Sequence, residues 1–453
     1  MVGVCLLAAA LAGRADTGAR DPRVEQQIKL LATGNEWARA VAAGSLGELG
    51  ERCAVEPLIK VLDDPDVRVR AAAVAALAQL GDRRAVDPVT GRLTDPEPEV
   101  RAAAARALGV LKAKSALDAL NGLLKDDAWR VRAASAQALA TLGDPRALPH
   151  LIAALGADDA DERVAAADAL GELCAGAAVE SLIGALDDRS RHVRASAAAA
   201  LGRTGDTKAR KRLVEALDDR HVVVQAAAAR AIGRLGGEKA YLLLTSVLHD
   251  DRAALRVAAT EGLGDLAEER AIGPLVLMLK DQNRDVRLAA RRSLLKIGRP
   301  VVEPAIEALR DENEHAAASA AFILGRLGAK RSIEPLIAAL DDDRGSVRQA
   351  AAEALVKLGA PAVEPLISTL GEGSRQQRVL AARMLGELRP PTALGSLIAA
   401  LGDEAWEVRM GAALALGKLG DGKAVEPLEK MVETSDPRVR DAILQAIFML
   451  RAQ

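Results

Sequence analysis

The chain has 453 residues, of which 50% are hydrophobic, 1% aromatic and 27% charged. So few aromatic side chains argue against a compact enzyme, whose core draws much of its burial from aromatic residues, and the apolar content argues against disorder. The formal net charge of −2 creates no overall field that would draw the protein to nucleic acid or to an anionic membrane.

The first twenty residues differ from the rest of the chain. The apolar run from Val2 to Ala12 has the length of a signal-peptide core, but no Lys or Arg precedes it. Residues 1–20 are therefore predicted to be a truncated signal peptide or a disordered leader, and we favour export to the periplasm or cell envelope over a cytoplasmic location. No run approaches the about 20 apolar residues that a membrane span requires.

From residue 21 onward one unit recurs. Its pattern is seen in PDVRVRAAAVAALAQLGD, residues 65–82, and we call the second arginine of this pattern, Arg70, the anchor. The spacing between anchors is 31 residues, except for two steps of 30, which end at residues 317 and 378. The fourteen anchor positions are Arg39, Arg70, Arg101, Arg132, Arg163, Arg194, Gln225, Arg256, Arg287, Ala317, Arg348, Arg378, Arg409 and Arg440.

Each unit is predicted to hold two helices. The first is typified by residues 54–64, where Val55, Leu58, Ile59 and Leu62 fall on one helical face. The second begins just before the anchor, and in eight units a capping residue lies four positions ahead of the anchor: Asn35, Asp66, Asp159, Ser190, Asn283, Asn313, Ser374 and Asp436. In nine units a glycine eleven positions after the anchor ends the second helix: Gly50, Gly81, Gly143, Gly205, Gly236, Gly298, Gly328, Gly359 and Gly420.

A single helix pair of this length cannot bury enough apolar surface to fold alone, so neighbouring pairs must stack. The sequence therefore predicts an all-α protein, an α-solenoid (superhelix) of about fourteen two-helix repeats that forms one domain over residues 21–453. The two 30-residue steps shorten a turn, and we expect a small change of curvature there.

The combination of D-x-x-V-R-x-A-A-A-x-A-L-G-x-L-G with A-V-E-P-L-I-x-A-L resembles the HEAT-like repeat of the phycobilisome-lyase type, over essentially residues 21–453. The resemblance implies that the second helix of each pair lines the concave face. Proteins similar in this way include bilin lyase subunits, di-iron deoxyhypusine hydroxylases and bacterial scaffold proteins that carry out no chemistry.

The residues offer little support for either kind of enzyme. The hydroxylases bind iron through His-Glu dipeptides, and none of the five histidines here is followed by glutamate. Cys53 and Cys174 could be sites of transient thioether bonds to a bilin, but they lie about four repeats apart. We therefore predict no catalytic residues, no metal and no cofactor, and keep a bilin-lyase-like enzyme or enzyme subunit as the alternative.

The anchor arginines allow two interpretations. They could form a track for nucleic acid, or they could pair with the aspartates that recur at the turn inside each repeat, such as Asp64 and Asp188. We favour a structural ladder, and we assign the turn aspartates to capping and pairing and not to a metal site.

A stripe of exposed positions on the second helices becomes basic from about the sixth repeat. This asymmetry suggests a groove for a protein partner, one with an acidic segment, although Glu261, Asp265 and Glu353 interrupt the stripe and a solvated charged face is the alternative. The candidate binding residues are Arg203, Arg230, Arg234, Arg292, Lys296, Arg326 and Lys357.

The last helix, from Val439 onward, is apolar around most of its surface. We expect either self-association or a partner contact there, or Phe448 packed inward over a small last layer. Trp129 and Trp406 lie at the start of second helices, where they either pack against the next turn or form binding hot spots. Together these features predict a non-catalytic scaffold that binds a protein partner on its concave face.

Overall fold

The computed structural model describes residues 21–433 and 436–452, and every regular element in these ranges is helical. The chain divides into two compact units, with the boundary between Arg212 and Leu213, inside α14 (Arg210–Glu215). The predicted leader, residues 1–20, lies outside the described residues. The division follows no linker, and the expectation of one domain over residues 21–453 stays a prediction.

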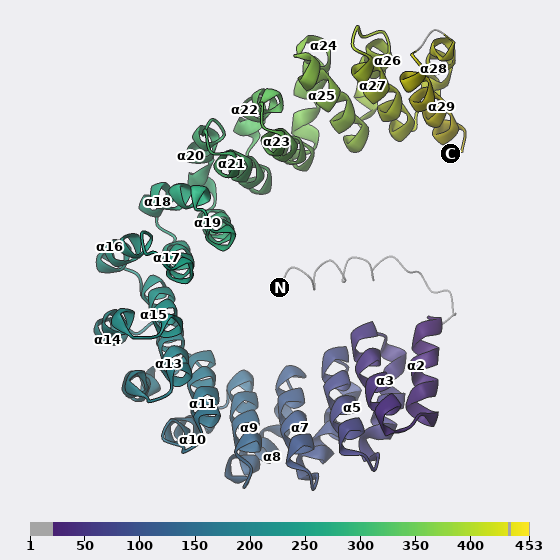
Figure 1. Ribbon diagram of the computed structural model, residues 1–453. Helices are drawn as coiled ribbons and strands as arrows, with labels where there is room; N and C mark the ends of the chain where they lie inside the picture. The colour runs from purple at the N-terminus through teal and green to yellow at the C-terminus, as the bar shows by residue number, and fades with distance from the viewer. Residues whose placement is uncertain (1–20, 434–435, 453) are drawn as a thin grey trace. The chain divides into compact units, whose positions relative to one another are not determined.

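Fourteen helix pairs follow one another along the chain, with even-numbered first helices and odd-numbered second helices (Figure 1). The second helices of the N-terminal unit are α3 (Glu36–Leu49), α5 (Val67–Leu80), α7 (Pro98–Val110), α9 (Trp129–Leu142), α11 (Ala160–Glu172) and α13 (Arg191–Thr204). Those of the C-terminal unit are α15 (Val222–Leu235), α17 (Ala253–Leu266), α19 (Arg284–Ile297), α21 (Glu314–Leu327), α23 (Gly345–Leu358), α25 (Arg375–Leu388), α27 (Trp406–Leu419) and α29 (Pro437–Arg451).

The first helices form the other layer of each unit. In the N-terminal unit they are α2 (Pro22–Thr33), α4 (Val55–Lys60), α6 (Val86–Gly91), α8 (Leu117–Gly122), α10 (Ala147–Ala154) and α12 (Val179–Gly184). After α14 the C-terminal unit contains α16 (Glu238–Val247), α18 (Ile272–Leu277), α20 (Val302–Ala308), α22 (Ile333–Ala338), α24 (Val363–Glu372), α26 (Leu394–Ala400) and α28 (Val425–Val432). The predicted α-solenoid of two-helix repeats is confirmed.

The first helix is less regular than its sequence pattern predicts. The stretch predicted as one helix over residues 54–64 consists of a 3₁₀ turn (Arg52–Ala54), α4 and a second 3₁₀ turn (Val61–Asp63). The Asp64 N–H donates to the Val61 carbonyl at 3.2 Å, an i to i−3 bond that satisfies a carbonyl left over at the helix end. The chain can therefore turn into the second helix at once.

The caps of the second helices follow the sequence pattern closely. Seven of the eight predicted capping side chains accept a backbone N–H, and Ser190 does not. All nine predicted terminal glycines have positive φ. In four of the five repeats that lack this glycine, another residue takes a positive φ of 49–55° at this position: Lys112, Cys174, Ala267 and Arg389.

Close packing between consecutive second helices depends on a glycine eight residues after the anchor. A Cβ atom on Gly233 would lie 2.3 Å from the carbonyl oxygen of Gly262, and one on Gly325 would lie 2.7 Å from the Cα of the next helix. Leu295 and Val356 hold this position in the two repeats that precede the 30-residue steps. Their side chains leave less room for close approach, and α19–α21 and α23–α25 are less closely packed than their neighbours. The change of curvature expected there stays a prediction.

Candidate functional site

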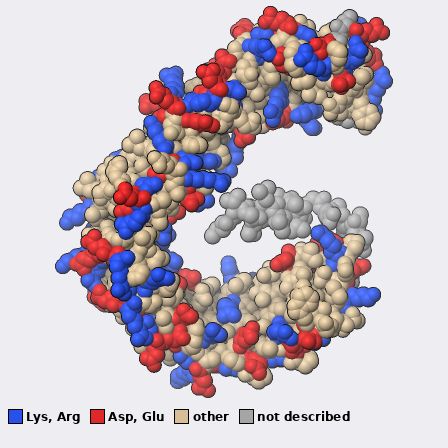
Figure 2. All heavy atoms as spheres, viewed as in Figure 1, with Lys and Arg blue, Asp and Glu red and all other residues tan. Residues whose placement is uncertain are grey.

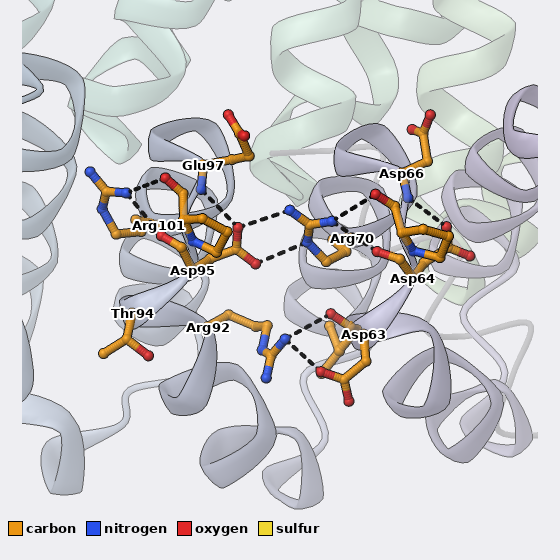
Figure 3. Close-up of polar contacts among 12 residues, drawn as sticks. Asp63, Asp64, Asp66, Arg70, Arg92, Thr94, Asp95, Glu97 and Arg101 are labelled. Carbon is orange, nitrogen blue, oxygen red and sulfur yellow. Dashed lines mark hydrogen bonds and ion pairs between the residues drawn. The ribbon is translucent and has the colours of Figure 1, made fainter.

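The anchor arginine ties each repeat to the next. Arg70 donates Nε and Nη2 to the carboxylate of Asp95 in the following repeat, both at 2.9 Å. Its Nη1 donates to the carbonyl oxygens of Asp64 and Pro65 in its own repeat, at 2.8 and 3.2 Å (Figure 3). One guanidinium therefore holds two successive turns, in the forked geometry that favours arginine over lysine.

The same contact recurs along both units. Six arginines pair with an aspartate 25 residues later at 2.7–2.9 Å: Arg39–Asp64, Arg70–Asp95, Arg101–Asp126, Arg163–Asp188, Arg256–Asp281 and Arg378–Asp403. Four further anchors donate Nη1 to the two loop carbonyls of their own repeat: Arg194, Arg287, Arg348 and Arg409. The predicted ladder is confirmed.

Five carboxylates of the ladder have a lowered pKa, which favours the ionised form: Asp64, Asp95, Asp126, Asp188 and Asp281. Burial alone would raise the pKa of Asp95, but hydrogen bonds from Arg70 and from the Glu97 backbone N–H outweigh it and lower that pKa. The hydrogen bond from Arg101 lowers the pKa of Asp126 in the same way. These arginines and aspartates stabilise the stacking of repeats, since both charges of each pair are engaged within the protein.

In the repeat that follows Arg132 the loop aspartate is missing, and another residue replaces it. The loop position is Ala157, and Arg132 pairs instead with Glu162 at 2.8 Å. Glu162 lies immediately before its anchor, a position that holds no other acidic residue in the chain. The glutamate compensates for the missing acid.

Two repeats lack the anchor arginine, and the repeat that follows each supplies a second one. Arg252 donates Nη1 to the side-chain oxygen of Gln225 at 2.9 Å. Arg344 donates Nη1 to the carbonyls of residues 311 and 312, at 2.7 and 2.8 Å, where an arginine at position 317 would otherwise bind. Our sequence reasoning missed this pairing. The signal was present, because arginine occurs four residues before the anchor only in the two repeats that follow Gln225 and Ala317.

The seven candidate binding residues fall in both units. Arg203 lies on α13 in the N-terminal unit, 4.0 Å from Asp168, whose pKa is raised by burial despite this arginine. The other six lie on second helices of the C-terminal unit: Arg230 and Arg234 on α15, Arg292 and Lys296 on α19, Arg326 on α21 and Lys357 on α23. In Figure 2 basic side chains project from the inner side of this unit around α19 and α21.

The acids that interrupt the stripe neutralise half of these six residues. Arg230 pairs with Glu261 at 3.3 Å. Asp265 lies between Arg234 and Lys296 and binds both, at 3.1 and 2.5 Å. In the part of the chain that the structure describes, the remaining three make no ion pair: Arg292, Arg326 and Lys357.

A groove of about 590 Å³ lies on this face across α15, α17 and α19. Its apolar lining comes from Val222, Val223, Ala226, Ala254, Val257, Leu288 and Ala289, and its charged lining from Arg230, Glu261, Asp285 and Arg292. Val223 is 43% exposed. The groove and the unpaired basic residues meet at Arg292.

Two residues beside Arg292 were not singled out from the sequence. The Arg291 guanidinium stacks on the ring of Phe322 at 3.7 Å, and burial lowers the pKa of Arg291. Both side chains lie at the contact between α19 and α21, which we call the joint and where Leu295 keeps the two helices apart. Phe322 is 36% exposed, so this joint adds aromatic surface to the basic face.

The two cysteines considered as sites of bilin attachment do not lie together. Cys53 and Cys174 are exposed thiols in different repeats. Across residues 21–433 and 436–452, no three His, Cys, Asp or Glu side chains gather as metal ligands would, and no helix has the length and hydropathy of a membrane span.

The C-terminal helix leaves large apolar side chains exposed. Phe448 is 75% and Leu444 50% exposed, so the alternative in which Phe448 packs inward is wrong, and self-association through α29 stays a prediction. Trp406 stacks under Arg438 of the following repeat at 3.9 Å, and Trp129 lies beside Arg130 in its own helix. For Trp406 the packing interpretation is confirmed.

Comparison with known proteins shows which family these repeats match. A family model described as HEAT repeats matches residues 24–97, 88–171, 148–223, 211–295, 302–378 and 363–447. The bilin biosynthesis protein PecE of Mastigocladus laminosus is 36% identical over 80 residues, which are 17% of this chain and 30% of that protein. The phycocyanobilin lyase subunit alpha of Pseudanabaena tenuis is 43% identical over 89 residues, 18% of this chain and 33% of the relative. The chain thus spans about a third of the length of these curated relatives.

Among solved structures, the karyopherin Kap121p, bound to the extreme C-terminus of the protein phosphatase Cdc14p, has a TM-score of 0.52 and 12% identity, over 94% of this chain and 66% of the karyopherin. At that identity the likeness shows the fold alone. The recurring helix pair, the ladder and the family match along nearly the whole described chain lead to one conclusion: the chain belongs to the HEAT-repeat family, with repeats similar to those of bilin lyase subunits.

Proposed function

We propose that the protein is a non-catalytic scaffold that binds a protein partner through the second-helix face of its C-terminal unit, and that the partner contributes an acidic segment. The observation that carries the proposal is the row of Arg292, Arg326 and Lys357, which lie on three successive second helices and form no ion pair with any acid among the described residues. Basic side chains that are already paired gain little from a new carboxylate, whereas unpaired ones can contribute to affinity and association rate.

The architecture supports a binding function. A HEAT-repeat solenoid presents an extended surface on which one face of successive helices can follow a segment of a partner. A karyopherin of the same fold class is seen with the C-terminus of another protein bound to it. The groove across α15, α17 and α19 adds apolar surface beside the basic row.

Affinity purification from the native cell, followed by mass spectrometry, tests the proposal. We expect the substitutions Arg292→Glu, Arg326→Glu and Lys357→Glu together to lose most of the captured partner. A matched control reverses three exposed basic residues outside the row and the groove, Lys239, Arg299 and Lys330. If the row variant captures every partner as the wild type does, or if the control variant loses the partner to the same extent, the proposal is wrong.

A second candidate function is a bilin-lyase-like enzyme or enzyme subunit. It is supported by the curated relatives, which are named as a bilin biosynthesis protein and a phycocyanobilin lyase subunit. A chromophore transfer assay with phycocyanobilin and an apo-phycobiliprotein separates the two functions. Transfer by the wild type that is lost in Cys53→Ser or Cys174→Ser would favour the lyase, and absence of transfer would favour the scaffold.

A further inference from the structure

The groove and the basic row are parts of one surface. The groove is formed by the N-terminal halves of α15, α17 and α19, and Arg292 lies at its edge. From Arg292 the row continues to Arg326 on α21 and Lys357 on α23. The surface therefore changes in character along the unit, from apolar at α15 and α17 to basic at α21 and α23.

The groove is suited to an uncharged side chain. Of its charged lining, Arg230 and Glu261 pair with each other, and Asp285 and Arg292 add one charge of each sign at the α19 side. Its floor is aliphatic, and Val223 stays 43% exposed without a partner. Its volume of about 590 Å³ lies within the range of about 300–1,000 Å³ that is typical of ligand pockets, which is ample for one large side chain.

The basic row is suited to carboxylates. Of the nearby acids on α17, Glu261 and Asp265 are engaged with basic residues, and Glu353 on α23 accepts a hydrogen bond from Gln349. The Arg291–Phe322 stack fills the joint between α19 and α21 without adding negative charge. A ligand that reaches this part of the face meets positive charge with exposed aromatic surface beside it.

We propose that the partner's segment is an extended peptide with two parts: one large apolar side chain that occupies the groove, followed or preceded by a run of acidic residues that pair with Arg292, Arg326 and Lys357. The inference rests on the proposed function and deepens it by fixing the order of the two parts on the surface.

The distance between helices sets the length of the acidic run. Packed helices lie about 8–10 Å apart and Leu295 keeps α19 and α21 somewhat farther apart, so the step from α19 through α21 to α23 covers at least roughly 20 Å. An extended chain advances about 3.3 Å per residue, so about six residues span this distance. The acidic run should therefore begin next to the apolar residue and extend over about six positions.

Fluorescence anisotropy with the full chain and labelled peptides tests the proposal. The probes are a tryptophan followed by six acidic residues, the same composition with tryptophan in the middle of the run, the acidic run with serine in place of tryptophan, and a peptide with all acids replaced by amides. We expect the first peptide to bind at least tenfold more tightly than any of the others, with an affinity that falls as salt rises. If the position of tryptophan has no effect, the two-part peptide is wrong.

Protein variants separate the two parts. Val223→Asp should weaken the tryptophan-first peptide about tenfold and leave the serine peptide unchanged. The double variant Arg326→Glu, Lys357→Glu should weaken both peptides. Leu277→Asp, at a 56% exposed leucine of the first-helix layer, is the matched control and should change neither.

The outcomes distinguish failure of this inference from failure of the proposed function. If the charge variant loses the native partner but Val223→Asp binds both peptides as the wild type does, the scaffold proposal stands and the apolar anchor is wrong. If the charge variant retains the native partner, the proposed function itself fails. A single-stranded oligonucleotide of equal charge that binds as tightly as the best peptide would overturn the inference in favour of a general polyanion surface.

Discussion

Arg344 provides the sharpest test of how the repeats are held together. Its Nη1 binds the carbonyls of residues 311 and 312 in the preceding repeat, and its Nε and Nη2 bind Asp342 at 2.8 and 2.7 Å. The substitution Arg344→Ala removes both sets of contacts in a repeat that has Ala317 where others have an anchor arginine.

The size of the effect follows from these contacts. A hydrogen bond to a charged group contributes about 1.5–3 kcal/mol when it is buried, but the Arg344 side chain is 26% exposed, so water will replace part of what is lost. We expect a local loss of about 2 kcal/mol, which corresponds to roughly 30-fold faster exchange of the amides it protects.

Native-state hydrogen exchange is the suitable measurement, because a solenoid opens locally and a global unfolding curve averages over repeats. The amides of residues 316 and 317, at the start of α21, should lose protection in Arg344→Ala. In the control Arg331→Ala, which breaks an exposed pair with Glu303, the amides of the same region should change by less than about 0.5 kcal/mol.

The compensation between repeats predicts the sign of a double mutant. Ala317→Arg alone should be neutral or destabilising, because two guanidinium groups would compete for the same carbonyls. In the Arg344→Ala background it should restore about half of the lost protection, since an arginine at position 317 then occupies the ordinary anchor site. If the double variant is no better protected than Arg344→Ala, or if Arg344→Ala resembles Arg331→Ala, the reasoning is refuted.

Three further predictions concern stability. Gly325→Ala should destabilise the protein by about 1–3 kcal/mol, because the new Cβ would lie 2.7 Å from the next helix. Gly44→Ala should stabilise it by up to about 1 kcal/mol, because the space around Gly44 is open. Thermal melts that show equal effects of the two substitutions would contradict this. Ala267→Gly should stabilise by about 0.5–1 kcal/mol, because Ala267 holds a left-handed φ of 54°, and a lower Tm would count against it. Hydrogen bonds from Arg68 lower the pKa of Asp66 from 3.8 to about 2. The contribution of the ionised Asp66 carboxylate to folding stability is therefore fully present above pH about 4 and is lost as the pH falls through about 2. The Tm difference between wild type and Asp66→Asn should shrink over this range.

Much of the fold could be predicted because every copy of the repeat carries the same residues that begin and end its helices. The anchors, the capping residues and the terminal glycines each recur at fixed positions, and only Ser190 failed among the predicted caps. The 3₁₀ turns that flank α4 could not be predicted, because helical periodicity is the same for a regular helix and for one with tightened ends. The compensating Arg344 was readable in principle, but only after the ladder geometry had shown what Ala317 lacks.

The sequence by itself determined the repeat, its two helices and the pairing of Arg70 with an acid of the next turn, because these depend on local propensity and on a spacing repeated fourteen times. Only the tertiary structure decided which basic residues remain available. Asp265 lies between Arg234 and Lys296 and neutralises both, while Arg326 forms no ion pair within residues 21–433 and 436–452. Which basic residues are paired depends on how three neighbouring helices place their side chains. The distance between those helices depends in turn on whether a glycine or Leu295 lies at their contact.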